Sequence, residues 1–383
     1  MQFIDLAAQY QHLKTRIDSR IQTVLDHGQY IMGPEVKELE EQLAKYVGVK
    51  HAITCGNGTD ALSLALMAMN VGEGDAVFVP TFTFFASAEA VAFAKATPIF
   101  VDSDSTTFNM CPVDLERKIQ AVKEEGKLNL KTIMSVDLFG QPANYPKIKR
   151  IAKTHQLTIL EDSAQGFGGA IEDENGRLQM AGSFGDIATT SFFPAKPLGC
   201  YGDGGAIFTD SDDYAELIKS YRVHGKGTNK YDNVRIGMNS RLDTIQAAIL
   251  LEKLACFPQE VIDRNKVAMI YEAALKGKLK TPEVPGGYTS SWAQYTLIAE
   301  SSEQREKLMS SLKESAVPTV VYYGTCMHQQ TAFKYLGLDH DQFPNAEALA
   351  GTVFSLPMHP YITPEQQGVV IEKLYEAYMD LIK

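Results

Sequence analysis

The chain has 383 residues, of which 45% are apolar and 22% are charged, and its formal net charge is −11. This length fits one large α/β domain with a smaller attachment, or roughly two to three folding units. The negative charge argues against a nucleic-acid-binding surface, because phosphate backbones select for clustered lysine and arginine. It leaves room for a phosphorylated small ligand.

Signals for membranes, disulfides and metals are missing from the sequence. The five cysteines are scattered without a Cys-x-x-Cys pair, so neither a disulfide framework nor a zinc knuckle is expected. The eight histidines form no His-Glu-x-x-His motif. The first residues do not resemble a signal peptide, and no run of roughly 18 uncharged apolar residues occurs. We therefore expect a cytoplasmic protein without a metal, membrane or nucleic-acid partner.

In chain order, helical spacing predicts helices over residues 7–28 and 35–46, and the rest alternates short apolar runs with amphipathic ones. The predicted strands cover residues 76–80, 98–102, 132–138, 158–161, 187–193 and 206–209. The later predicted helices cover residues 86–95, 145–155, 244–254 and onward, 303–315 and 364–382. This alternation predicts an α/β fold with a large, mostly parallel sheet.

Two domains are expected from the same pattern. Residues 1–255 would form the large domain with an N-terminal arm, and residues 256–383 a smaller C-terminal α+β domain. Ligands of parallel sheets gather where strands end and loops begin. Asp162, Lys196 and residues 81–84 each follow a predicted strand, so we expect them at one edge of the sheet.

Lys196 lies in a segment rich in proline and glycine, residues 191–205. A rigid surround suits a lysine that presents its amine to a carbonyl group and forms a Schiff base. An ordinary exposed loop lysine is an equally open interpretation of this segment alone.

Two further motifs have a chemical and a structural interpretation. The glycines before Thr59, including Gly58, precede an apolar run and could cradle a phosphate at a helix N-terminus, or form a simple capped turn. Asp162 ends a predicted buried strand, where it could pair with a protonated pyridine nitrogen or cap a helix. Gln165 is close enough to reach the same ligand. Phe84 could stack on a planar ring or pack in the core.

Polar residues in the second half of the chain are also candidates. Asn239 suits a phosphate and Arg241 a carboxylate, although a surface turn with one ion pair fits the same residues. His328 could line a cleft in the C-terminal region, with a core or surface role as the default.

In combination, three motifs resemble the DegT/DnrJ/EryC1/StrS family of nucleotide-sugar aminotransferases, which use pyridoxal 5′-phosphate (PLP). The motifs are Gly-Asn-Gly-Thr-Asp-Ala-Leu at residues 56–62, Glu-Asp-Ser-Ala-Gln at 161–165, and the glycine-rich segment 192–205 around the lysine. The resemblance covers nearly the whole chain. It implies a fold type I, aspartate-aminotransferase-like architecture and a homodimer with active sites at the subunit interface.

The resemblance also implies residue roles. Lys196 would bind PLP as an internal aldimine and then move protons, and lysine in place of the histidine of related dehydratases implies transamination. The remaining implied cofactor-binding residues are Gly58, Thr59 and Ser191 at the phosphate, Asn239 reaching that phosphate from the partner subunit, Asp162 at the ring nitrogen, Phe84 on the ring face and Gln165 at its hydroxyl side.

Within the family, residues 27–34 and 239–243 resemble 3-aminotransferases acting on UDP-linked 3-keto-2-acetamido-glucuronic acid, with glutamate as donor, for bacterial surface polysaccharides. Arg241 would then bind the sugar carboxylate. Tyr322, Tyr323 and His328 are the other implied substrate-binding residues. Their segment departs from the family pattern, because Tyr322 stands where histidine is common. A 4-aminotransferase for a 4-keto-6-deoxy sugar nucleotide and a noncatalytic regulator are the alternatives.

Overall fold

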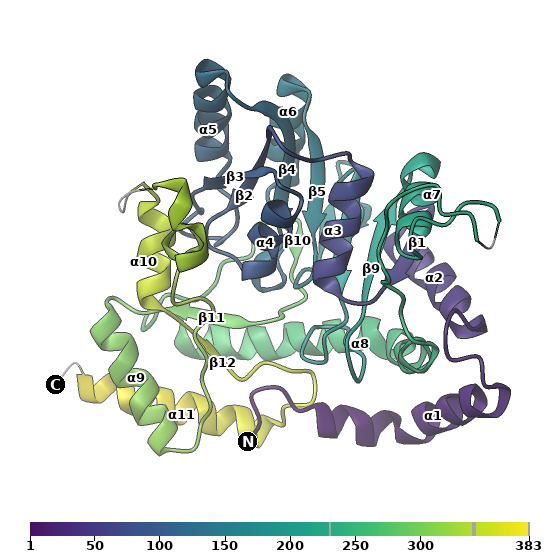
Figure 1. Ribbon diagram of the computed structural model, residues 1–383. Coiled ribbons are helices and arrows are strands. Elements are labelled where there is room, and N and C mark those ends of the chain that lie inside the picture. Colours follow the sequence, from purple (N-terminus) through teal and green to yellow (C-terminus); the bar gives the residue numbers. More distant parts are fainter. Residues whose placement is uncertain (230, 339–341, 382–383) are drawn as a thin grey trace.

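The computed structural model describes residues 1–229, 231–338 and 342–381. A large sheet flanked by helices occupies one end of the molecule, and a smaller helical region with a two-stranded sheet lies at the other (Figure 1). The predicted α/β fold is confirmed. No helix among these residues is long and apolar enough to cross a membrane.

The central sheet has seven strands in the order β1-β9-β8-β5-β4-β2-β3. Its strands are β1 (His51–Cys55), β2 (Asp75–Pro80), β3 (Thr97–Val101), β4 (Asn129–Val136), β5 (Thr158–Asp162), β8 (Ile187–Ser191) and β9 (Gly205–Thr209). β9 is antiparallel to both of its neighbours, and the other six strands run in one direction. All six predicted strands are present, and β1 joins them as a seventh that was not predicted.

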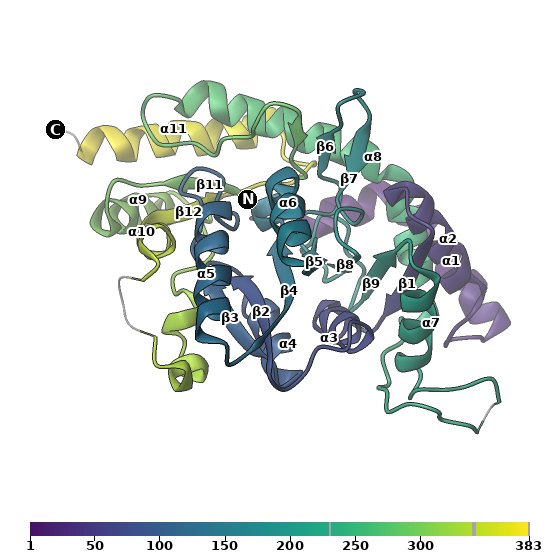
Figure 2. The same ribbon diagram turned by 90° about the horizontal axis from the view of Figure 1, so that it is seen from above.

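Different helices cover the two faces of this sheet. They are α2 (Pro34–Val47), α3 (Gly58–Ala68), α4 (Phe85–Phe93), α5 (Pro112–Glu125), α6 (Tyr145–His155), α7 (Asp212–Tyr221) and α8 (Thr244–Leu275). Because strand side chains alternate, Val77 and Val79 of β2 pack in the core that contains α3, α4 and α7, whereas Ala76 and Phe78 pack with α5 and α6. α2 and α8 cover β1, β8 and β9 on the latter face. Figure 2 shows α3 and α4 on one side of the sheet and α8 on the other.

The C-terminal region adds the remaining elements. They are β10 (Tyr288–Thr289), which joins β6 (Ala170–Glu172) and β7 (Leu178–Met180), then β11 (Tyr295–Ile298), α9 (Ser302–Glu314), α10 (Pro344–Thr352), β12 (Val353–Leu356) and α11 (Pro364–Leu381). The predicted helices are confirmed, except that residue 382 of the last one lies outside the described residues. Phe333, Phe343 and Leu349 are buried in the same core as α3 and α4, so part of this region covers the large sheet.

α8 passes through the predicted domain boundary at residues 255 and 256 without interruption. Its side chains up to Val261 belong to the core beneath the large sheet, and those from Val267 onward belong to the core of the C-terminal region. The change of core therefore falls within one helix and no linker separates the two regions. The division into residues 1–255 and 256–383 stays a prediction.

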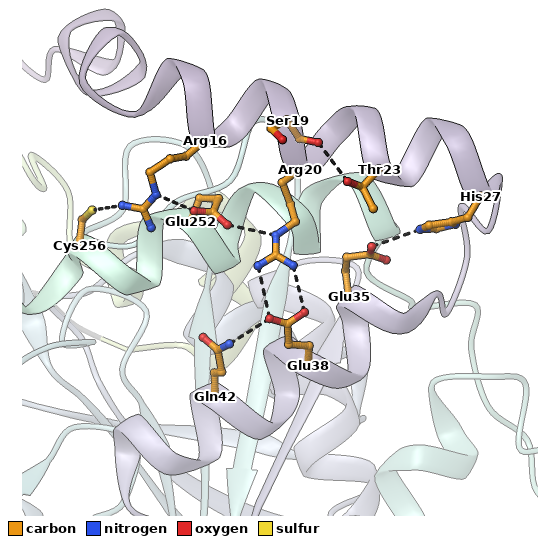
Figure 3. A network of polar contacts seen from close by, with 10 residues as sticks. All are labelled: Arg16, Ser19, Arg20, Thr23, His27, Glu35, Glu38, Gln42, Glu252 and Cys256. Atoms are coloured by element: carbon orange, nitrogen blue, oxygen red, sulfur yellow. Dashed lines mark hydrogen bonds and ion pairs between the residues drawn. The ribbon is translucent and has the colours of Figure 1, made fainter.

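The N-terminal helix α1 (Leu6–His27) is held against α8 and α2 by ion pairs (Figure 3). The carboxylate of Glu252 in α8 accepts from Arg16 at 2.8 Å and from Arg20 at 3.0 Å. Arg20 also reaches Glu38 of α2, at 3.2 Å. Leu13 and Ile17 of α1 are buried beside Ile249 of α8, so the contact has an apolar centre beneath its charged rim.

Candidate active site

The carboxyl ends of β1, β5 and β8 meet at one edge of the sheet because these strands are parallel, and β9 begins at the same edge. Gly205, the first residue of β9, pairs with Cys55 at the end of β1 and with Ser191 at the end of β8. Asp162 is the last residue of β5. The edge therefore carries the N-terminus of α3, the Asp162 carboxylate and the segment that contains Lys196. The sequence predicted Asp162 and Lys196 at this edge together with residues 81–84, which follow β2.

Lys196 lies in the connection between β8 and β9, residues 192–204, which is tied across its base. The Phe192 amide donates to Gly204 O at 2.8 Å, and the Lys196 amide donates to Phe193 O at 2.9 Å. The side chain is partly buried. This burial lowers the pKa of the Lys196 ammonium, and the charge of Asp162 partly opposes the shift. A lowered pKa leaves more of the amine unprotonated and able to attack a carbonyl carbon.

Asp162 is 5% exposed and faces this lysine without a close ion pair. Ser87 Oγ donates to one carboxylate oxygen at 2.8 Å and the Ala164 amide to the other at 3.2 Å. Burial raises the pKa of Asp162, while these two hydrogen bonds and the charge of Lys196 lower it. No lysine, arginine or histidine nitrogen in the described part of the chain lies within 4.0 Å of this carboxylate. A buried carboxylate of this kind fits a ligand that brings its own cation, such as a protonated pyridine ring.

The N-terminus of α3 presents hydrogen-bond donors beside Ser191. Asn57 caps the helix by accepting from the Asp60 amide at 2.8 Å, which leaves the amides of Gly58 and Thr59 without a partner among the described residues. A Cβ at Gly58 would lie 2.7 Å from Ser191 Cβ, so the helix start and the end of β8 are in direct contact. Free amides at a helix N-terminus beside a hydroxyl fit a phosphate group.

Three predicted residues, Gln165, Phe84 and Tyr323, lie together near Asp162. Gln165 is buried; its side-chain oxygen accepts from the Phe139 amide at 2.8 Å, and its Nε2 donates to the Tyr323 hydroxyl at 3.1 Å. The ring of Phe84 lies 6.0 Å from the Tyr323 ring and remains half exposed. Phe84 precedes α4, whose residue Ser87 bonds Asp162. A planar ring next to Asp162 would thus find an aromatic side chain and an amide close by.

In the described part of the chain, the other candidates form no hydrogen bond with Lys196 or Asp162. Asn239 is exposed, and Arg241 is partly buried with no hydrogen bond or ion pair to the described residues. Tyr322 contacts Phe3 and Tyr323 through its ring. His328 is 5% exposed, with one ring nitrogen 2.7 Å from Thr81 Oγ1 and the other 3.1 Å from Glu347. The structure thus ties His328 between two elements, which does not favour a direct contact with substrate.

Two residues of this edge were missed by the sequence reasoning. Ser87 is one turn into α4 and resembles any helical serine in the sequence. Lys253 lies in α8, where a lysine usually points to solvent, yet its Nζ donates to Gly199 O at 2.6 Å. Only the folded arrangement brings them to the Asp162 and Lys196 segments.

The fold and the chemistry of this edge together point to a PLP-dependent transferase. The model of the DegT/DnrJ/EryC1/StrS aminotransferase family matches residues 11–375, and the chain belongs to this family. Among curated proteins, it is 44% identical to the UDP-2-acetamido-2-deoxy-3-oxo-D-glucuronate aminotransferase of Pseudomonas aeruginosa, covering 94% of this chain and 96% of that protein. It is 42% identical to the pleiotropic regulatory protein of Geobacillus stearothermophilus, covering 98% of each.

Solved structures agree with the family. A DegT/DnrJ/EryC1/StrS aminotransferase from Brucella abortus matches with a TM-score of 0.95 and 47% identity, over 99% of each chain. NtdA from Bacillus subtilis, solved with bound cofactor PMP, matches with a TM-score of 0.87 and 29% identity, over 99% of this chain and 85% of that one. The predicted fold type I architecture and the prediction of a PLP-dependent nucleotide-sugar aminotransferase are confirmed.

Proposed function

We propose that this protein transfers an amino group from L-glutamate to C3 of a UDP-linked 3-keto-2-acetamido-glucuronic acid, in the synthesis of a bacterial surface polysaccharide such as O-antigen or capsule. The similarity to the Pseudomonas aeruginosa enzyme supports this sugar. The single observation that carries the chemistry is the pair formed by the Lys196 amine, with its lowered pKa, and the buried Asp162 carboxylate.

Bound PLP would supply an aldehyde that exchanges with amines and a ring that stabilises negative charge on the neighbouring carbon. In the proposal, Lys196 Nζ would hold PLP covalently and, when free, would accept and donate a proton. Asp162 would keep the ring nitrogen protonated. Because the amides of Gly58 and Thr59 lie beside Ser191 and have no partner among the described residues, these three residues would bind the phosphate.

The remaining residues have proposed roles at the ring and the sugar. Phe84 packs on the ring face and Gln165 lies at the ring hydroxyl, as their positions beside Tyr323 support. Arg241, whose guanidinium has no partner among the described residues, would bind the sugar carboxylate, with Tyr322 and Tyr323 lining the sugar site. We assign His328 a structural role, since both of its ring nitrogens are engaged.

A homodimer with shared sites is part of the proposal. The exposed, unbonded side chain of Asn239 supports a role at the phosphate of the partner subunit. Mixing subunits tests it: Lys196→Ala and Asn239→Ala proteins are each expected to be inactive, and refolding them together in equal amounts should restore about a quarter of wild-type activity. A mixture as inactive as its components would contradict shared sites.

The function itself is tested with purified protein, PLP and glutamate. The visible absorbance of bound PLP should disappear when glutamate is added. Mass spectrometry should then show that the keto group of the 3-keto-uronate nucleotide has been replaced by an amino group. Lys196→Ala should abolish turnover. If only a 4-keto-6-deoxy nucleotide sugar is aminated, the 4-aminotransferase alternative holds. A noncatalytic regulator predicts that glutamate leaves the absorbance unchanged.

A further inference from the structure

Lys253 is a fully buried lysine that none of the steps above uses. It lies in the middle of α8 with 0% of its surface exposed. Its Nζ donates to Gly199 O at 2.6 Å and lies 4.4 Å from the centre of the Tyr201 ring. Both contacted residues belong to the connection between β8 and β9 that carries Lys196, so Lys253 attaches this segment to α8.

A second side chain of α8 holds the same segment. Gln246 precedes Lys253 by seven residues, which places both on one face of the helix. Its side-chain oxygen accepts from the Tyr201 amide at 2.8 Å, and its Nε2 donates to Tyr201 O at 3.4 Å. The backbone at residues 199 and 201 is thereby bonded at three points to a long helix that is buried beneath the sheet.

The bond from Lys253 to Gly199 also affects the position of Lys196, because the backbone at Gly199 contacts the backbone just before Lys196. A Cβ at Gly199 would lie 2.5 Å from Pro194 O and 2.6 Å from Phe193 O, so the chain after Lys196 packs tightly on the chain before it. The Phe193 carbonyl is also the acceptor of the Lys196 amide. A displacement of Gly199 therefore shifts the turn from which the Lys196 side chain extends.

Burying the ammonium group of Lys253 costs desolvation free energy. Burial lowers its pKa to about 8, while the charges of Glu260 and Cys200 oppose that shift. An apolar side chain of similar length would avoid the desolvation of an ammonium group. What the ammonium adds is a short, directed bond to one carbonyl.

We propose that Lys253 is a positioning residue that fixes the Lys196 segment through its bond to the Gly199 carbonyl, and so sets where the Lys196 amine meets the cofactor. This inference rests on the proposed role of Lys196 as the lysine that binds PLP. It predicts that removing the donor at position 253 lowers the rate of the step that depends on Lys196 more than it weakens substrate binding.

The test compares Lys253→Met, which keeps the length but not the donor, with Lys253→Gln, which keeps a donor without the charge. For Lys253→Met we expect kcat to fall about tenfold or more, with KM for glutamate within about twofold of wild type, because a misplaced reacting group costs rate more than binding. The pH midpoint of the absorbance of PLP bound to Lys196 should shift, and Lys253→Gln should recover part of both effects.

Arg264→Met is the matched control. Arg264 is another buried cation of α8, but it donates to Trp292 O and Met358 O, far from the Lys196 segment in sequence. This variant should lower the melting temperature and leave the absorbance midpoint and kcat unchanged. If Lys253→Met behaves in the same way, the proposal is wrong.

Amide hydrogen exchange provides a readout that needs no cofactor. Peptides from residues 193–204 of the apoprotein should exchange faster in Lys253→Met than in wild type or in Arg264→Met. If wild type fails to bind PLP at Lys196, the proposed function fails while this measurement still decides whether Lys253 holds the segment. Should Lys253→Met not fold, Lys253→Leu and Gln246→Leu, which also remove the donors to this segment, replace it, and unchanged exchange in both overturns the proposal.

Discussion

The pKa of Asp162 is raised by its burial and lowered by several neighbours, and one of those that lower it is Ser87 of α4. Burial raises the pKa of the carboxyl group, while Ser87, Ala164 and Lys196 lower it. Ser87 is the only one of the three that reaches Asp162 through a side-chain hydroxyl, from the first turn of α4. The ability of Asp162 to stay charged, and so to hold a cation, is therefore set partly by a helix on the same face as α3.

We predict that Ser87→Ala lowers kcat about five- to thirtyfold. Loss of a hydrogen bond to a buried carboxylate costs about 1–2 kcal/mol and raises the pKa of Asp162 further, which weakens its hold on a protonated ring. The measurement is kcat together with the affinity for PLP. Ser355→Ala, which removes a buried hydroxyl bonded to Thr296 at 2.9 Å, is the control and should leave both unchanged. Equal effects of the two substitutions would refute the role of Ser87.

At the scale of elements, β4 and β5 place two carboxyl groups against each other beneath the site. Asp137, just after β4, accepts at one oxygen from the Ala143 amide and the Tyr145 hydroxyl, both at 2.9 Å, and no described residue donates to its other oxygen. Glu161 in β5 accepts from the amides of residues 182, 184 and 185. Burial and the charge of Glu161 hold the pKa of Asp137 well above its usual value, so Asp137 carries the proton of the pair.

We predict that Asp137→Asn makes the protein more stable relative to wild type at alkaline pH. A carboxyl group whose pKa is raised on folding contributes stability that is complete below the unfolded value of about 3.9 and is lost as pH rises through the folded value. The asparagine amide donates without titrating. Urea unfolding at pH 6 and pH 8.5, at fixed protein concentration, should show a gap that widens with pH. A gap independent of pH would contradict the shared proton.

The elements differ in how far the sequence predicts them. The six predicted strands lie in short apolar runs of the sequence, whereas β1 mixes histidine, threonine and cysteine with two apolar residues. The reversed direction of β9 follows from the connection of residues 192–204, which returns the chain beside β8 and which periodicity does not reveal. Asp162, Lys196 and residues 81–84 predicted the site at the sheet edge because each follows a predicted strand. Ser87 and Lys253 were not predictable, since their partners lie 75 and 54 residues away in the chain.

At the scale of the whole molecule, buried charges join the N-terminal arm, α8 and the C-terminal region. Glu260 of α8 accepts from Gln9 of α1 at 2.9 Å and from the hydroxyl of Tyr361 at 2.6 Å. One turn further, Arg264 lies close enough to His359 for its charge to act on that ring. His359 is 2% exposed and its Nδ1 has no partner among the described residues, so this junction tolerates only the neutral imidazole.

We predict that His359 makes the protein sensitive to mild acid. Burial and the charge of Arg264 lower its pKa to about 4, with Asp5 opposing the shift. A lowered pKa contributes stability that is present above the unfolded value of about 6.5 and is lost as pH falls toward 4, on the order of 2 kcal/mol between pH 7 and 5. Urea unfolding should show this loss in wild type and in His12→Gln. The same slope in His359→Gln would rule the mechanism out.

Phe333, Phe343 and Leu349 come from the last fifth of the chain, yet they complete the core over α3 and α4. During synthesis on a ribosome, the core that these residues complete around α3 and α4 stays partly uncovered until α10 has emerged. We therefore expect the edge that holds Lys196 and Asp162 to reach its final form only when translation is almost finished. A fragment ending at residue 255 should expose this apolar core and aggregate, whichever domain boundary is drawn through α8.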